Sequence, residues 1–160
     1  MLLHLVRHGD AGDPAAWNGP DAARPLSDKG RGQAERLGVF LADHDVKMDA
    51  VITSPKLRAV QTAEIVAGHL GASVTTDDRL GDALDLATLD AVLTDAGDPD
   101  RAILFGHDPD FSEFVAELCS ASNVPMRKGA LAKIEVDRPL QTAGGTLRWL
   151  IPPDALRRKG

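Results

Sequence analysis

Cysteine, tyrosine and excess positive charge are scarce in this sequence, and each shortage excludes a class of protein. The 160 residues include one cysteine, Cys119, so neither an internal disulfide nor a cysteine-rich metal site is available. Aromatic residues make up only 4% of the chain and tyrosine is absent, which disfavours the stacking platforms that bind single-stranded nucleic acid. Because the net charge is −6, a nucleic-acid partner would gain no electrostatic attraction and is not expected.

Long hydrophobic runs are also missing. The first apolar run, residues 1–6, is interrupted by Arg7 and lacks the basic region that precedes the apolar core of a secretory signal. No window approaches the ~20 apolar residues of a membrane span. We therefore expect a cytoplasmic protein without a membrane association. No coiled-coil heptad is visible, and this favours a monomer.

The chain does contain short apolar runs that alternate with stretches of helical periodicity. With 43% hydrophobic and 26% charged residues, it is expected to fold as one domain over residues 1–160. Strands are predicted at 2–6, 50–53, 74–76, 102–105, 131–136 and 146–151, and helices at 27–43, 55–70, 86–96 and 111–119. Strand–helix alternation of this kind predicts a layered α/β fold with a largely parallel sheet.

Three predicted strands end in residues that carry chemistry. In open α/β sheets, ligands bind at the carboxyl ends of the strands. The first strand ends in Arg7, His8 and Gly9, the second in Ser54 and Pro55 with Arg58 shortly after, and the fourth in Gly106 and His107. Ser54 is expected to cap the following helix, with Pro55 at its first position. Two histidines and two arginines should therefore converge on one rim.

This set of side chains suits a phosphoryl group. Two guanidiniums can hold phosphoryl oxygens by paired hydrogen bonds and stay charged at any working pH. A neutral imidazole is a good nucleophile near pH 7, and Gly9 lets the backbone approach a ligand closely. A metal site is not expected, because no nearby Cys, Asp or Glu completes a ligand set with His4 and His8. His4 is expected to be a core residue.

Several motifs together resemble the histidine phosphatase superfamily, which has the phosphoglycerate-mutase-like fold. They are Arg7-His8-Gly9, Arg24-Pro25-Leu26-Ser27, Ser54-Pro55 with Arg58, and Gly106-His107 with Pro109. The short chain and its opening are most similar to the SixA branch of phosphohistidine phosphatases. The resemblance implies a three-layer sandwich, in which a mixed, mostly parallel sheet has helices on both faces. It also implies that His8 is phosphorylated during turnover, that Arg7, Arg58 and His107 complete the phosphate pocket, and that no metal or organic cofactor is needed.

The sequence departs from the superfamily where many members carry a glutamic acid that protonates the leaving group. Asp82 is the nearest candidate for a general acid here, although an exposed loop acid or a helix cap is the simpler interpretation. An alkoxide leaving group needs a proton in the transition state, whereas imidazole, with a pKa of about 6.5, leaves more easily. The missing acid is therefore consistent with a phosphohistidine substrate. Asn18 is a further candidate for substrate contact from the loop after Gly9.

Three functions follow as hypotheses. The first is hydrolysis of phosphohistidine on a protein, such as a histidine-containing phosphotransfer domain in signal transduction. The second is a phosphatase for small phosphomonoesters, such as sugar or nucleotide phosphates, for which Asp82 would have to matter. The third is a phosphate-binding module without catalysis, which the intact set of Arg7, His8, Arg58 and His107 argues against.

Overall fold

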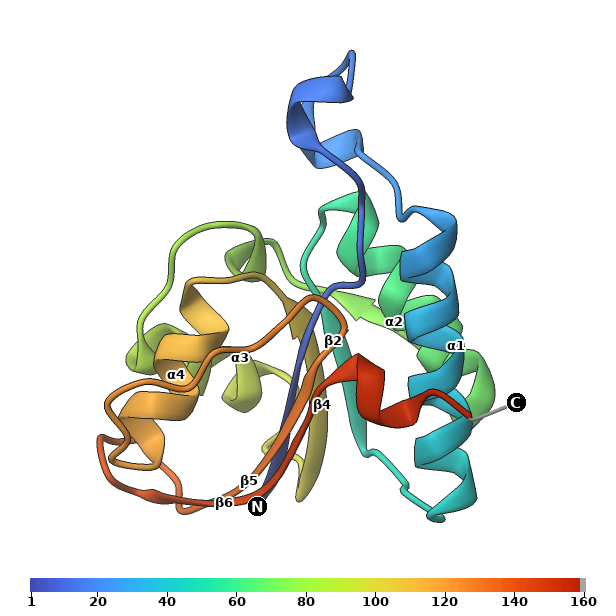
Figure 1. Cartoon of the computed structure of the whole chain (residues 1–160). Helices are drawn as coiled ribbons and strands as arrows, with labels where there is room; N and C mark the ends of the chain where they lie inside the picture. Colours follow the sequence, from blue (N-terminus) through green and yellow to red (C-terminus); the bar gives the residue numbers. More distant parts are fainter. Residues whose placement is uncertain (159–160) are drawn as a thin grey trace.

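A six-stranded sheet lies between two layers of helices in the computed structural model, which describes residues 1–158 (Figure 1). Its strands are β1 (Leu2–Arg7), β2 (Ala50–Thr53), β3 (Thr75–Thr76), β4 (Arg101–Gly106), β5 (Leu131–Val136) and β6 (Gly145–Ile151), in the order β3-β2-β4-β1-β5-β6. Neighbouring strands are parallel from β3 to β1, and β5 runs antiparallel between β1 and β6. The predicted mixed, mostly parallel sheet is confirmed.

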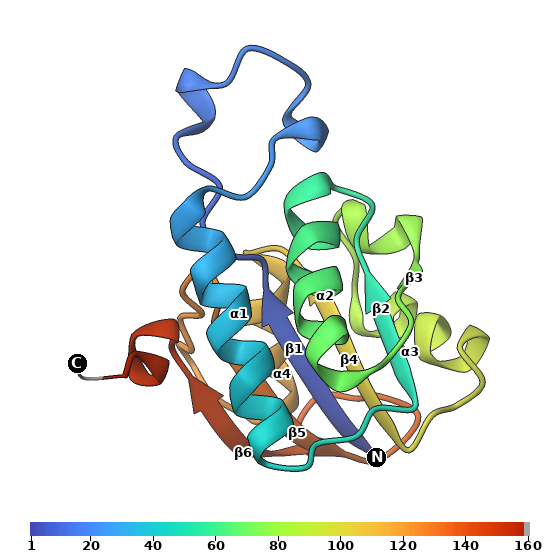
Figure 2. The same ribbon diagram turned by 90° about the vertical axis from the view of Figure 1, so that its right-hand side faces the viewer.

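The helices cover both faces of this sheet, as the resemblance implied (Figure 2). They are α1 (Asp28–Asp43) and α2 (Leu57–Leu70) on one face, and α3 (Leu86–Asp95) and α4 (Asp110–Leu118) on the other. Side chains alternate between the faces along a strand. Phe105 of β4 therefore packs with Leu37 of α1, whereas Leu104 packs in the other core with Phe111 of α4. Burial of such a side chain contributes about 1.5–3 kcal/mol.

The helix ends match the sequence signals at α1 but not at the start of α2. Ser27 caps α1 by accepting a hydrogen bond from the Gly30 amide at 3.1 Å, and Gly71 ends α2 with a φ of 62°. The prediction that Ser54 caps α2 is wrong, because Lys56 is the N-cap and the helix begins at Leu57. Ser54 has another use: its Oγ lies 2.7 Å from a ring nitrogen of His107 and accepts from the Lys56 amide at 3.2 Å.

The segment after His8 projects beyond the sheet as an arm, residues 11–25, at the top of Figure 1. It contains two short turns of 3-10 helix, η1 (Pro14–Ala16) and η2 (Asp21–Ala23). The buried side chain of Arg24 closes its base, since Nη1 donates to the Ala11 carbonyl at 2.7 Å and Nε donates to the Asp21 carboxylate at 3.2 Å. Within the described residues, no helix combines the length and apolar character that a membrane crossing needs.

Candidate active site

The carboxyl ends of β1, β2 and β4 meet at one edge of the sheet and bring the predicted site residues together. His8 follows β1, Arg58 lies in the first turn of α2, and His107 follows β4. Arg58 Nε donates to Nε2 of His8 at 3.4 Å, and the centroids of the His8 and His107 rings are 5.1 Å apart. Arg7, the last residue of β1, pairs with Asp108, the neighbour of His107, at 3.5 Å. All four side chains therefore surround one small region.

The hydrogen bonds of His8 fix which ring nitrogen carries the proton. Nδ1 lies 2.7 Å from the carbonyl oxygen of Gly9, which can only accept, so Nδ1 is the protonated nitrogen. Nε2 then presents its lone pair toward the Arg58 donor. Burial lowers the pKa of His8 to about 4, and the charges of Arg58 and Arg7 lower it too, against the opposing effect of the Gly9 hydrogen bond. Near pH 7 the ring is neutral and has the lone pair that a nucleophile needs.

Access to His8 is narrow. The residue is only 5% exposed, and the guanidinium of Arg58 lies against its Nε2. A phosphoryl group that reaches Nε2 must therefore take over the Arg58 Nε donor from the ring. A guanidinium that gives up this contact can donate to a phosphoryl oxygen instead.

His107 has one nitrogen engaged and one without a partner. Its Nε2 lies 2.7 Å from Ser54 Oγ, and its Nδ1 is buried without a hydrogen bond within the described residues. If Ser54 donates to Nε2, the single proton of a neutral ring sits on Nδ1, where it forms an unused donor. Burial lowers the pKa of His107 to about 3, and the neighbouring His8, Lys56 and Arg58 lower it as well. The ring is neutral near pH 7.

Arg7 provides a second unused donor beside His8. Its Nη1 donates to the Met126 carbonyl at 2.8 Å, which fixes the guanidinium, while its Nε is buried and unpaired in the described part of the chain. An unpaired buried donor costs about 1–3 kcal/mol. Arg7 Nε and His107 Nδ1 are thus both buried without a hydrogen-bond partner in the described residues, on two side chains that lie near His8.

Asp21 of the arm holds Arg58, a contact that the sequence pattern did not indicate. Arg58 donates through Nη1 to the backbone carbonyl of Asp21 at 2.9 Å and through Nη2 to its carboxylate at 3.0 Å. Burial raises the pKa of Asp21, but the nearby Arg58 and Arg24 outweigh this effect, so the net shift is downward. The carboxylate is therefore ionised near pH 7, and it leaves Nε of Arg58 directed at His8. No motif marks Asp21, because it is an exposed residue in a loop.

The three remaining predicted site residues are placed differently. The amide of Gly9 donates to Thr62 Oγ1 at 3.1 Å, and a Cβ at Gly9 would lie 2.8 Å from the Gly30 carbonyl oxygen, so packing against α1 already requires a glycine. Asn18 is exposed on the arm. Asp82 is exposed in the loop after η3 (Asp78–Gly81), and Asp85, not Asp82, caps α3. Asp82 is thus an exposed loop acid, and its role as a general acid stays a prediction.

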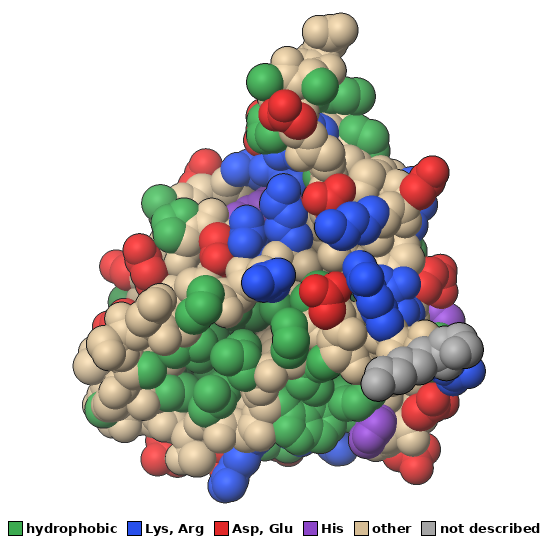
Figure 3. Space-filling model, in the orientation of Figure 1, with side chains coloured by type: hydrophobic (Ala, Val, Ile, Leu, Met, Phe, Trp, Pro, Cys, Tyr) green, Lys and Arg blue, Asp and Glu red, His purple; other side chains and the backbone are tan. Residues whose placement is uncertain are grey.

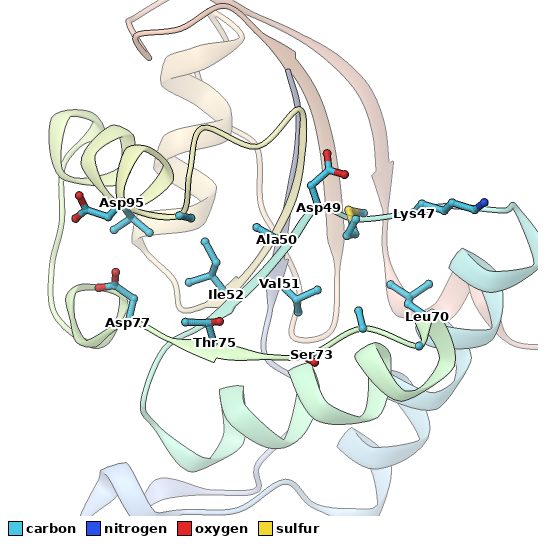
Figure 4. A pocket seen from close by; sticks show the side chains of 15 residues that line it. Lys47, Asp49, Ala50, Val51, Ile52, Leu70, Ser73, Thr75, Asp77 and Asp95 are labelled. Atoms are coloured by element: carbon cyan, nitrogen blue, oxygen red, sulfur yellow. The ribbon is translucent and has the colours of Figure 1, made fainter.

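A cavity of about 760 Å³ lies away from this site, between the start of β2, the end of α2 and α3 (Figure 4). None of the predicted site residues lines it. Its acidic side chains have partners, since Asp77 and Asp95 pair with Arg79 and Asp49 pairs with Arg101. Lys47 is the one basic residue in its lining, so a phosphoryl ligand there would meet a single positive charge and none of the predicted site residues.

Known proteins resemble this chain in sequence and in fold. Residues 3–86 match the histidine phosphatase superfamily (branch 1). Phosphohistidine phosphatase SixA of Escherichia coli (strain K12) is 31% identical over 163 aligned positions, which cover 98% of this chain and 97% of the relative. A solved structure of the protein histidine phosphatase SixA complexed with tungstate superposes with a TM-score of 0.84 at 28% identity, covering 98% of this chain and all of that one. The chain belongs to the histidine phosphatase superfamily.

The fold alone extends to more distant proteins. The alpha-ribazole phosphatase from Shigella flexneri superposes with a TM-score of 0.74 at 19% identity, covering 96% of this chain and 97% of that one. Its name describes a different substrate, so the fold by itself does not select the substrate.

Proposed function

We propose that this protein is a phosphohistidine phosphatase, which removes the phosphoryl group from a histidine of a partner protein through a phosphorylated His8. The observation that carries the proposal is the neutral His8 ring, protonated on Nδ1 by its Gly9 contact, with unpaired buried nitrogens on the neighbouring Arg7 and His107. The names of the SixA relatives support the substrate class. Tungstate, which one of them holds, is an oxyanion with the tetrahedral shape of phosphate.

In the first step, the lone pair of His8 Nε2 forms a bond to phosphorus in line with the leaving group. The bond between phosphorus and the substrate nitrogen breaks, its electron pair stays on that nitrogen, and the released imidazole takes up a proton from water. Arg7, Arg58 and His107 donate to the equatorial oxygens, where charge stabilisation contributes most to phosphoryl transfer. The proton of His8 stays on Nδ1 throughout, and Nδ1 donates it in a hydrogen bond to the Gly9 carbonyl.

In the second step, water attacks the phosphorus of phospho-His8 on the side opposite Nε2. The P–N bond breaks, the electron pair returns to Nε2, and the water proton leaves with the solvent as inorganic phosphate is released. The burial that keeps His8 neutral also favours this step, because the ring leaves phosphorus as a neutral imidazole, which is a good leaving group. Neither step needs a metal ion.

The exposed position of Asp82 favours a nitrogen leaving group over an oxygen one. An alkoxide would need an acid within hydrogen-bond reach, and Asp82 makes no hydrogen bond to the four site residues within the described part of the chain. We further place the reaction in the cytoplasm and propose that residues 1–160 act as one catalytic domain and a monomer, on a phosphotransfer domain or a similar partner.

A substrate panel tests the proposal. A phosphohistidine protein, an aryl phosphate and an alkyl phosphate are compared with wild type, His8→Ala and Asp82→Asn, each with and without a chelator. We expect fast discharge of the phosphohistidine, loss of turnover in His8→Ala, little effect of Asp82→Asn and none of the chelator. Preferred hydrolysis of the alkyl ester, lost in Asp82→Asn, would assign the protein to small phosphomonoesters. Binding of the phosphoprotein without discharge would make it a phosphate-binding module.

A further inference from the structure

Two neighbouring clefts beside the site are lined by basic side chains. The first, of about 290 Å³, contains Arg7 of the site together with Lys29, Arg127 and Lys128. The second, of about 420 Å³, contains Lys29 again, with Arg36, Arg157 and Arg158. Because Lys29 lines both, the clefts adjoin. We call the following six residues outside the site the basic track: Lys29, Arg36, Arg127, Lys128, Arg157 and Arg158.

The positive charge of the basic track is local and does not follow from composition. The two clefts hold these six basic residues and only three acidic ones, Asp10, Asp28 and Asp154, whereas the whole chain has a net charge of −6. In Figure 3, Lys and Arg side chains gather below the arm and continue down one side toward the C-terminus. A patch whose sign opposes that of the whole protein attracts a partner of the other sign over about 8 Å at physiological salt.

The charges of the basic track are also less neutralised than others on the surface. Arg79, Arg138 and Arg148 each pair with a carboxylate elsewhere. Within the described residues, by contrast, Lys29, Arg36 and Arg127 form no ion pair, and Nε of Arg36 is buried without a hydrogen-bond partner. Lys128 pairs with Asp10 only at 3.8 Å and Arg157 with Asp154 at 3.3 Å. Most of this positive charge is available to a partner.

The shape of α1 keeps the basic track open along its length. Lys29, Gly32 and Arg36 recur at the spacing of one helix face. Gly32 lines the second cleft, and a Cβ there would lie 3.2 Å from Nη1 of Arg36, so the missing side chain leaves room for that guanidinium. Lys29 and Arg36 are about 10 Å apart along the helix at 1.5 Å per residue. A small phosphate ester held by Arg7 would not reach Arg36.

We propose that the basic track docks an acidic segment of the protein that carries the phosphohistidine, adjacent to the phosphohistidine itself. The proposal rests on the proposed function, because Arg7 joins the track to the phosphate pocket. A protein segment fits better than a nucleic acid, since the chain as a whole is acidic and the clefts contain no aromatic side chain for base stacking.

Two phosphohistidine peptides test the docking: one flanked by a run of glutamates and one in which glutamines replace them. We expect wild type to prefer the glutamate peptide by about tenfold in kcat/KM at low salt, and to lose this preference at high salt. Lys29→Glu and Arg36→Glu should each abolish the preference. Lys47→Glu is the matched control, because Lys47 is exposed, precedes β2 at the opposite end of the sheet and undergoes the same change of charge.

Free phosphohistidine provides the second readout, because it is too small to contact the basic track. Its hydrolysis should change by less than about twofold in Lys29→Glu and Arg36→Glu, which shows that the fold and the pocket are intact. Equal hydrolysis of the two peptides by wild type, or a preference that survives both substitutions, overturns the docking proposal while the phosphatase stands. Failure of wild type to hydrolyse free phosphohistidine and both peptides overturns the proposed function instead.

Discussion

Acidification should destabilise this fold through histidines that are buried in neutral form. Burial lowers the pKa of His4 and of His8 to about 4 and that of His107 to about 3. A histidine whose pKa is lower in the folded state binds its proton more tightly when unfolded. Its contribution to stability is therefore complete above the unfolded pKa of about 6.5 and is lost as the pH falls toward 4.

His4 allows this effect to be measured outside the catalytic site. It is 1% exposed on β1, and its Nδ1 lies 3.3 Å from the Ala102 carbonyl. A fall in pKa from 6.5 to about 4 corresponds to about 3 kcal/mol when fully expressed, and to about 2 kcal/mol between pH 7 and pH 5. The total stability of a domain is typically about 5–15 kcal/mol. One imidazole thus accounts for a substantial part of the acid sensitivity.

Urea unfolding of wild type and His4→Gln at pH 7 and pH 5, in phosphate-free buffer, measures this contribution. Gln keeps a donor for the Ala102 carbonyl but does not titrate. We expect the free energy of unfolding of wild type to fall by about 2 kcal/mol more than that of His4→Gln between the two pH values. His44→Gln, at the exposed end of α1, controls for the loss of a surface histidine. Equal losses in wild type and His4→Gln would refute the reasoning.

Two further predictions concern the packing and the chemistry of the site. Gly30→Ala should lower the free energy of unfolding by more than about 2 kcal/mol in chemical denaturation, because its Cβ would lie 2.0 Å from the Asp10 carbonyl oxygen. Gly68→Ala is the control, since nothing lies within 4 Å of a Cβ at that position. This control variant should be neutral or stabilising. Arg58→Lys removes the Nε–H that donates to His8 and the paired contact with Asp21. The kcat on phosphohistidine should therefore fall by about 10²-fold or more. A wild-type kcat in this variant would show that a point charge suffices.

The sequence predicted the fold and the convergence of the four site residues because both follow from regular geometry. Strand–helix alternation implies a mostly parallel sheet, and parallel neighbours align their carboxyl ends. His8 and His107 thus meet although they lie far apart in the sequence. The boundaries of β2 and β5 were predicted to the residue: β2 is a short apolar run, and the apolar residues of β5 are interrupted only by Lys133 and Glu135.

The contacts that orient these residues could not be predicted, because they join irregular segments. Ser54 before Pro55 is a local signal for a helix cap, yet its hydroxyl lies beside His107, 53 residues later in the chain. Asp21 reaches Arg58 from the arm, whose base Arg24 ties together through the Ala11 carbonyl. A side chain that contacts a residue far away in the sequence does not contribute to a periodic pattern. Sequence motifs therefore indicate the candidate catalytic residues but not the residues that position them.

Gly9 shows how a residue of a ligand motif also serves packing. The sequence suggested that its small size lets the backbone approach a ligand. In the structure the nearest neighbour of a Cβ there would be Gly30 of α1, and a Cβ on Gly30 would in turn meet Asp10. These two glycines let the first turn of α1 lie directly against the backbone that follows His8. Because Lys29 and Arg36 are on that same helix, the backbone contact fixes this part of the basic track relative to His8. If a partner docks on the basic track as proposed, these contacts hold it in register with His8, and enlarging either glycine should disturb docking and catalysis together.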